Sequence, residues 1–367
     1  MKYRKFLYIF ISAYLLLIGC VEKKTVGSQS EPGQVSLESV ELIHDSLLVK
    51  PNAIAITDDA IVVSNSATID GSLINIFNLN GDFVRSCMTY GEGPMEALDV
   101  ADIQYDATEH CLYVMDTQFN SYKVFRITDY LNPTISIKDV FSFSAADNDS
   151  IMLSGGAVYL SNGEIVAGNV NPAGMVAIFN DKGDPIRLFG KVPDKNLIDS
   201  RLTDFGNSSI YHQFVGVSPK CDFAAFYYDV SDMCLLINVI DKKTEINYVE
   251  GKPATGIYPS EMAPGVCVGA VTDKTFWHTQ GVSLSNKYIY QLYVGLLLED
   301  FYETDFFKDS KRFGANTVNV YDREGNHLKT LTLDRWATTL AVSPDDKYLY
   351  TLTQSSTEGY TLLRYAL

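Results

Sequence analysis

The sequence predicts an all-β protein built from six similar units, and three observations support this. Past residue 35, apolar residues fall in short alternating or continuous runs between turn residues, with almost no helical periodicity. One kind of hairpin turn recurs at Asp58, Asp106, Asn162, Pro219, Ser285 and Asp345, at intervals of 48, 56, 57, 66 and 60 residues. A second hairpin follows the first in several units, as in 74–87, 175–190 and 317–331.

Each unit therefore has four antiparallel strands, and six such units predict a six-bladed β-propeller over residues 35–367. After Asp345 the last unit has strands near 347–353 and 360–366 but lacks its outer strand. The strand-like run 35–49 is expected to take that place, which closes the ring and removes an exposed sheet edge. A pair of β-sandwiches or a β-helix are the alternatives, but sandwiches rarely contain six similar units and β-helix repeats are much shorter.

The first 19 residues are typical of a signal peptide. Basic residues between Lys2 and Lys5 precede the apolar segment 6–19. At about 1.5 Å per residue, this segment is too short to cross a hydrocarbon core of about 30 Å comfortably. The alternative is an uncleaved signal anchor in which Cys20 is buried.

The motif Leu17-Ile18-Gly19-Cys20 resembles the lipobox of bacterial lipoproteins. This resemblance implies that Cys20 becomes the mature N-terminus and carries a diacylglycerol that anchors the protein to a membrane. No Asp follows Cys20, so the sorting rule of that family implies the outer membrane. Residues 20–34 are polar and contain Gly, Ser and Pro, which predicts a flexible tether between the lipid and the propeller.

The charge and the cysteines exclude some functions. The net charge is −16, and no basic cluster follows the first few residues, which argues against a nucleic-acid partner. Five cysteines remain after Cys20, an odd number, so at least one is unpaired. Cys221 and Cys234 lie on the two arms of one predicted hairpin, but symmetric pairing places Cys234 opposite Tyr227. We therefore expect small buried apolar residues here.

The stretch "TYGEGPMEA" at 89–97 lies between the outer hairpin of the first unit and the inner turn of the second. Gly91, Gly93 and Pro94 are therefore predicted to form the crossover between two blades. The stretch does not fit a phosphate-binding loop, because it has no third glycine, no Gly-Lys-Ser/Thr and no helix after it.

Residues 90–127, "YGEGPMEALDVADIQYDATEHCLYVMDTQFNSYKVFRI", resemble the Gly-x-Gly-Pro-x-Glu segment and the following strand of the Bacteroidetes six-bladed propeller lipoproteins. These form the TolB-like group, which is close to the NHL-repeat proteins. The resemblance implies the fold and a place in the cell envelope. The sequence departs from the family at Met95, where a glycine is frequent, and at 298–312, an apparent insertion that alternates aromatic and acidic residues.

Catalytic signatures are scarce: the sequence has no His-Glu-x-x-His, Gly-x-Ser-x-Gly or Cys-x-x-Cys. The candidate ligand-binding residues are Tyr211, His212, Trp277 and His278, which adjoin one another in two aromatic stretches just before inner strands. No cofactor or metal is predicted. We expect a binding module for a small molecule, a glycan or an envelope protein. The alternative functions are a lyase or hydrolase that uses His212 or His278, and a purely structural partner of an outer-membrane complex.

Overall fold

The computed structural model describes residues 33–43, 47–66, 71–93, 96–118, 121–132, 136–144, 151–357 and 359–367. Gln34–Leu367 forms one unit. The signal peptide, Cys20 and Pro94 lie outside the described residues, so their predicted roles stay predictions.

The first three blades are four-stranded antiparallel sheets. Blade 1 contains β3 (Pro51–Ile56), β4 (Ala60–Asn65), β5 (Ser72–Asn78) and β6 (Phe83–Tyr90), with the short β7 (Glu96–Ala97) parallel to β6. Blade 2 contains β8 (Val100–Asp106), β9 (Cys111–Gln118), β10 (Ser121–Thr128) and β11 (Ser136–Ser144). Blade 3 contains β12 (Leu153–Tyr159), β13 (Ile165–Asn171), β14 (Gly174–Phe179) and β15 (Pro185–Phe189).

Of the other three blades, blade 4 is formed by consecutive strands, whereas blades 5 and 6 each include a strand from the N-terminal region. Blade 4 contains β16 (Gln213–Val217), β17 (Phe223–Tyr228), β18 (Cys234–Ile240) and β19 (Lys243–Val249). Blade 5 contains β22 (Phe276–Leu284), β23 (Tyr288–Leu297), β24 (Ala315–Asp322) and β25 (His327–Ala337), with β1 (Gly33–Leu37) beside β25. Blade 6 contains β26 (Thr339–Val342), β27 (Tyr348–Ser355) and β28 (Gly359–Ala366), with β2 (Ser39–Ile43) outermost.

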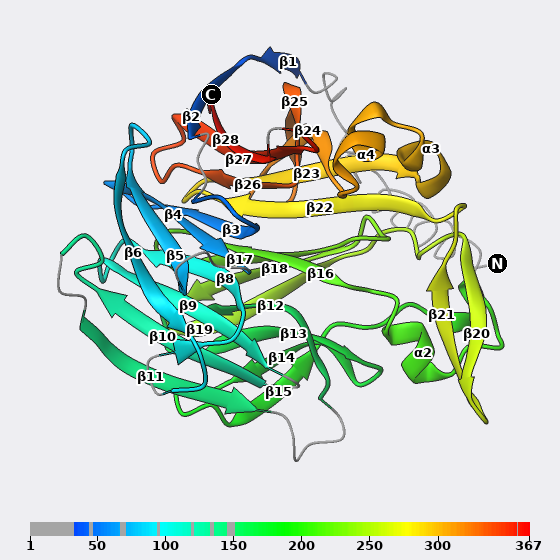
Figure 1. The fold of residues 1–367 in the computed structure, drawn as a ribbon. Coiled ribbons are helices and arrows are strands. Elements are labelled where there is room, and N and C mark those ends of the chain that lie inside the picture. Colours follow the sequence, from blue (N-terminus) through cyan, green and yellow to red (C-terminus); the bar gives the residue numbers. More distant parts are fainter. Residues whose placement is uncertain are drawn as a thin grey trace, which may run out of the picture. The chain divides into compact units, whose positions relative to one another are not determined.

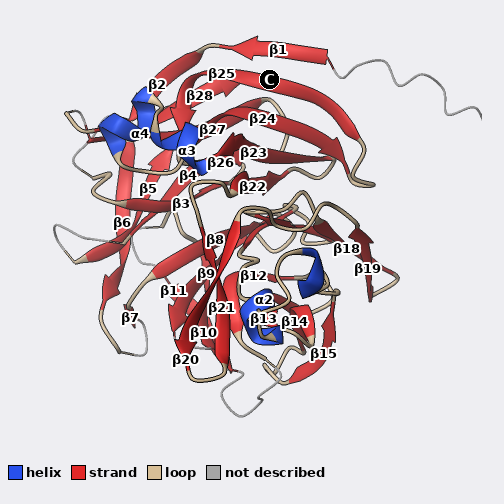
Figure 2. Ribbon diagram, turned by 90° about the vertical axis from the view of Figure 1, so that its right-hand side faces the viewer, coloured by secondary structure: helices blue, strands red, loops and turns tan. Residues whose placement is uncertain are grey.

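The six sheets form a six-bladed propeller, as the sequence predicts (Figures 1 and 2). The first strand of each blade is the inner one, and each inner strand contacts the inner strand of the next blade, from β3 through β8, β12, β16, β22 and β26 back to β3. The six predicted turns all lie at or between the first and second strands of their blades. Side-chain oxygens hold these turns: Thr57 Oγ1, for example, accepts from the backbone N–H of Ala60 at 2.8 Å.

The outer edge of blade 6 is formed by a strand from the other end of the chain. Strand β2 pairs antiparallel with β28, with Val40 opposite Arg364 and Glu41 opposite Leu363. Ile43 ends this strand and is only 4% exposed, in a core that also contains Tyr350 and Leu362. The run expected as one strand over 35–49 is interrupted at Glu38, so that β1 joins blade 5 and β2 joins blade 6.

Neighbouring blades are joined by packing and by polar contacts. The side-chain amide of Gln104 in blade 2 pairs with the backbone of Tyr159 in blade 3, donating to its carbonyl at 2.7 Å and accepting from its N–H at 2.9 Å. Cys234 lies opposite Tyr227, the predicted register. The five described cysteines, Cys87, Cys111, Cys221, Cys234 and Cys267, are all free.

The face on which the inner strands begin carries additional elements. They are the 3-10 helix η1 (Lys195–Leu197), α2 (Asp204–Ser208), the hairpin β20 (Ile257–Ala263) and β21 (Val266–Val271), and α3 (Leu298–Tyr302) with α4 (Asp305–Ser310). Ser208 in α2 donates to the carbonyl of Val170 at the end of β13 at 2.6 Å, and the N–H of Leu298 in α3 donates to the carbonyl of Thr275 at 2.9 Å. Figure 1 shows β20 and β21 projecting from the sheets. None of the described helices has the length and hydropathy needed to span a bilayer.

Deleting residues 21–43 should destabilise the propeller, because β28 would become an open edge and the site of Ile43 would be empty. We expect the free energy of unfolding to fall by at least about 3 kcal/mol, measured by chemical denaturation. Deletion of 21–32 alone is the control and should leave the midpoint unchanged. Equal midpoints for the two deletions would contradict the structural role of β2.

Candidate functional site

The inner strands of all six blades surround two cavities on the propeller axis. The mouth cavity, of about 350 Å³, lies where these strands begin, and its wall includes Ala101, Tyr122, Gly155 and Gln280. The inner cavity, of about 80 Å³, lies nearer the strand ends and is mainly bordered by aliphatic side chains. A cavity with converging polar groups at the end of a rigid scaffold is typical of a ligand site.

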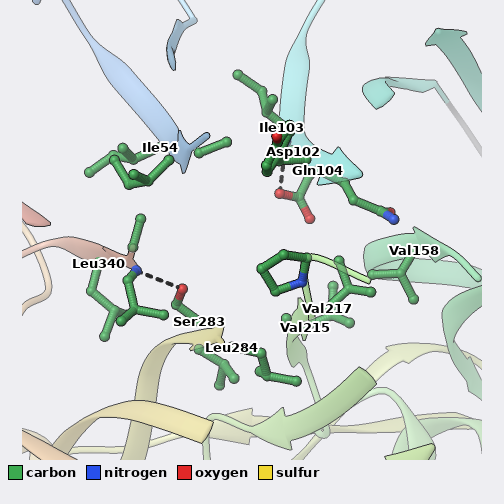
Figure 3. A pocket seen from close by; sticks show the side chains of 18 residues that line it. Ile54, Asp102, Ile103, Gln104, Val158, Val215, Val217, Ser283, Leu284 and Leu340 are labelled. Carbon is green, nitrogen blue, oxygen red and sulfur yellow. Dashed lines mark hydrogen bonds between the residues drawn. The ribbon is translucent and has the colours of Figure 1, made fainter. Parts of the chain in front are cut away.

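Five residues line both cavities and define a waist between them: Ile54, Asp102, Val215, Val282 and Leu340. Four of the five are aliphatic, so the waist is apolar apart from one carboxylate. Figure 3 shows this ring, with the carboxylate of Asp102 on the cavity side of β8.

Asp102 owes its position to local backbone irregularity. Pairing of β8 with β9 shifts register between Val100 and Asp102, which leaves Ala101 as an extra residue. Such bulges re-aim the side chains that follow them. The Oδ1 atom of Asp102 accepts from the N–H of Ile103 at 2.8 Å. A Cβ at Gly156, across from it, would lie 3.3 Å from Asp102 Oδ2 and 2.2 Å from Val215 Cγ1, so only glycine leaves room there.

The mouth offers hydrogen-bond acceptors on Asp102, Tyr122 and Gln280, and its lining also includes the polar residues Asn52, Gln213, Thr338 and Thr339. Burial raises the pKa of Asp102 to about 7. The Nε2 of Gln280 donates to the carbonyl of Thr338 at 3.4 Å, and its buried Oε1 has no partner among the described residues. The hydroxyl of Tyr122 donates to the carbonyl of Gly155.

Two of the four predicted site residues pack against neighbouring rings. Tyr211 is 1% exposed and meets Tyr228 edge-on, with ring centroids 6.2 Å apart. Trp277 stacks on Phe313, with centroids 4.8 Å apart and an interplanar angle of 15°. Phe313 also stacks on Phe301 of α3, so this cluster holds the insertion against blade 5.

The two predicted histidines lie on either side of one backbone segment. The carbonyl of His212 accepts from the N–H of Asp229 at 3.1 Å, and the N–H of His278 donates to the carbonyl of Asp229 at 2.6 Å. His212 is exposed, with Nδ1 3.5 Å from Ser154 Oγ, whereas Nδ1 of His278 is buried and has no partner among the described residues. Partial desolvation of the imidazole ring lowers the pKa of both histidines. Neither histidine lines the axial cavities.

Asp229 itself has an unusual environment. Its carboxyl is 4% exposed, its Oδ1 has no partner among the described residues, and burial raises its pKa to about 8. No cluster of three or more His, Cys, Asp or Glu side chains suitable for a metal occurs in the described part of the chain.

The crossover glycines lie next to an acidic side chain. Between β6 and β7, the N–H of Gly93 donates to Oε2 of Glu96 at 2.8 Å, and Lys123 donates to the carbonyl of Gly93 at 2.7 Å. A Cβ at Gly91 would lie 2.0 Å from the same Glu96 oxygen. Glu96 and Lys123 therefore fix this connection between blades 1 and 2.

The sequence analysis missed Asp102 and Gln280. The available signal was an acidic residue inside "VADIQYD", at a position where the other inner strands place small, apolar or neutral polar residues. Without the structure, nothing indicated that this side chain faces the axis.

Comparison with known families agrees with this architecture. The model of the family described as TolB-like 6-blade propeller-like matches residues 31–345. The chain belongs to this family. No curated protein matches the sequence.

The solved structures that this chain is similar to are distant from it in sequence. A Bacteroides fragilis NCTC 9343 protein whose name describes it as exported has a TM-score of 0.52 at 10% identity, with 91% of this chain and 98% of that chain covered. U3-55K has a TM-score of 0.48 at 10% identity, covering 90% and 98%. The WD40 repeats of RRP9 have a TM-score of 0.44 at 10% identity, covering 90% and 97%. At this identity, the B. fragilis likeness concerns the fold of this TolB-like chain and nothing more.

The Asp229 carboxyl should make stability depend on pH. The folded state keeps its proton up to about pH 8, whereas the unfolded chain loses it near pH 4, so this group's contribution to stability falls as pH rises between those values. In urea unfolding, D229N should gain stability relative to wild type by at least about 1 kcal/mol between pH 5 and 7.5. The exposed Asp181 gives a matched control, D181N, whose profile should parallel wild type. A parallel profile for D229N would contradict the assignment.

Proposed function

We propose that this TolB-like propeller is a lipid-anchored protein of the cell envelope that binds a small molecule in its mouth cavity. The observation that carries the proposal is the mouth cavity itself: all six inner strands line it, and a carboxylate and a tyrosine converge on it. A ring of rigid sheets holds such groups in fixed positions, which favours binding.

The difference between the two faces supports the choice of the mouth. Tight turns of a few residues join the strands on the opposite face, as at 57–59 and 285–287. The mouth face carries η1, α2, the β20–β21 hairpin, α3 and α4. Long connections on a rigid scaffold are where binding residues concentrate.

The envelope location rests on the N-terminal motif and on family membership. The apolar segment 6–19 and the lipobox ending at Cys20 predict export and lipidation. The sorting rule of the lipoproteins that the lipobox resembles supports the outer membrane, because no Asp follows Cys20.

An enzyme that uses His212 or His278 is the competing hypothesis. The buried Nδ1 of His278, which has no partner among the described residues, and the raised pKa of Asp229 favour it, since perturbed groups gather at catalytic sites. Against it, neither histidine lines the axial cavities. A lyase or hydrolase activity lost in H212A and H278A, but kept when the mouth is blocked, would favour the enzyme.

Blocking the mouth should abolish binding without unfolding the protein. Ala101 is exposed on the bulge of β8 and lines the mouth, so A101W places a large ring there. In a thermal-shift screen of small molecules, a ligand at 100 times its Kd stabilises by about 2.7 kcal/mol, and we expect wild-type hits to lose their shift in A101W. The control T108W adds the same ring at the opposite end of the β8–β9 hairpin and should keep all shifts. If the hits lose their shift equally in A101W and T108W, or keep it in both, the mouth is not the binding site.

Replacing Cys20 should release the protein from the membrane. In a bacterial host with lipoprotein processing, C20A should lose incorporation of labelled palmitate and move from the membrane pellet to the soluble fraction, because the acyl chains supply the anchoring free energy. C87A is the control and should keep both the label and the pellet location. Unchanged labelling of C20A would show that the lipobox assignment is wrong.

A further inference from the structure

The chemistry of the axial cavities restricts the class of ligand. Among the described residues that line the mouth and the inner cavity, Asp102 is the only charged one. No Lys, Arg or His side chain is present there to bind an anion. The chain as a whole carries a net charge of −16, which raises the local concentration of cations around the protein.

Other polar groups at the mouth favour a ligand that donates hydrogen bonds. The Oδ2 atom of Asp102 faces Gly156, and Gln280 contributes a buried amide oxygen that no described residue bonds. The Tyr122 hydroxyl uses its proton on the carbonyl of Gly155, so its free lone pair is an acceptor. A ligand that donates hydrogen bonds therefore fits this wall better than one that accepts them.

The waist supplies an apolar surface directly beside the carboxylate. Ile54, Val215, Val282 and Leu340 line both cavities together with Asp102. Figure 3 shows Ile54, Val215 and Leu340 around the same cavity as Asp102, so a ligand whose charged end meets Asp102 places its remaining atoms against aliphatic groups. A divalent metal ion needs about six oxygen ligands, and the described cavity lining offers a single carboxylate. An organic cation satisfies both parts of the site.

We propose that the mouth cavity binds an organic ammonium ion, a protonated amine carrying a small apolar group, with the ammonium on Asp102 and the apolar group at the waist. This inference rests on the proposed function, because it names the ligand class of the same cavity. A charge-assisted hydrogen bond to a partly desolvated carboxylate is stronger than one between neutral groups.

Binding should then depend on pH. Several titratable side chains lie on the elements around Asp102: Tyr105 and Asp106 on its own strand, Cys111, Tyr113 and Asp116 on β9, Tyr122, Lys123 and Arg126 on β10, Tyr159 on β12, and His212 ahead of β16. Burial raises the pKa of Tyr105 and of Tyr122, so neither ionises near neutral pH. A proton on Asp102 competes with the ligand, and with a pKa of about 7 the affinity should rise about tenfold between pH 6 and 8.

The test uses three probes of one shape and different charge: benzylammonium, benzyl alcohol and benzoate. Isothermal titration calorimetry compares the full-length wild type with D102N, which keeps the shape of the side chain, and with A101W. We expect benzylammonium to bind wild type at least tenfold more tightly than benzyl alcohol, and benzoate not to bind. D102N should lose that preference and the pH dependence, and A101W should bind no probe. The wild-type pH profile needs no variant, so it tests the proposal even if D102N is unstable.

The contrary outcomes separate this inference from the proposed function. Equal binding of benzyl alcohol and benzylammonium, lost in A101W, overturns the cation class and leaves the mouth as a binding site. Benzylammonium binding that survives in both variants lies elsewhere on the acidic surface and overturns the inference. If no probe binds but the screen yields ligands sensitive to A101W, the ligand class is wrong and the proposed function stands.

Discussion

The pairing of β2 with β28 is the contact on which the rest of the structure depends. In a ring of sheets each blade packs on two neighbours, so an incomplete last blade would weaken both of its interfaces. Without β2, the backbone groups along one side of β28 would be an open edge, which promotes association with other chains. The pairing joins residues more than 300 positions apart, from Ser39 opposite Tyr365 to Ile43 opposite Leu362.

The arrangement of the blades also creates the candidate site. Six inner strands that belong to six different sheets meet around one axis, and none of them could form a cavity alone. Polar contacts such as that between Gln104 and the backbone of Tyr159 fix the blades against one another. The rigidity that follows keeps Asp102 in an apolar waist, where its charge is costly without a partner and therefore selective for one.

Features set by residues close together in the sequence could be predicted. The contacts between side chains that lie far apart in the sequence could not. The hairpin turns, the number of blades and the register of Tyr227 with Cys234 follow from local alternation and turn chemistry. The short helices α3 and α4 are held by rings such as Phe301 and Phe313, whose contacts are tertiary. The direction of the Asp102 side chain depends on a bulge and on Gly156 beside it in the neighbouring blade, neither of which has a sequence signal of its own.

Hydrogen exchange of the backbone amides of β28 tests the closure of the ring most directly. Within Leu362–Tyr365, the part of β28 that pairs with β2, alternate N–H groups point toward β27 and away from it, and the second set is protected only if β2 is in place. The account predicts that both sets exchange as slowly as the amides of β27, through opening of the whole propeller. Rapid exchange of the outward set while β27 stays protected would contradict it.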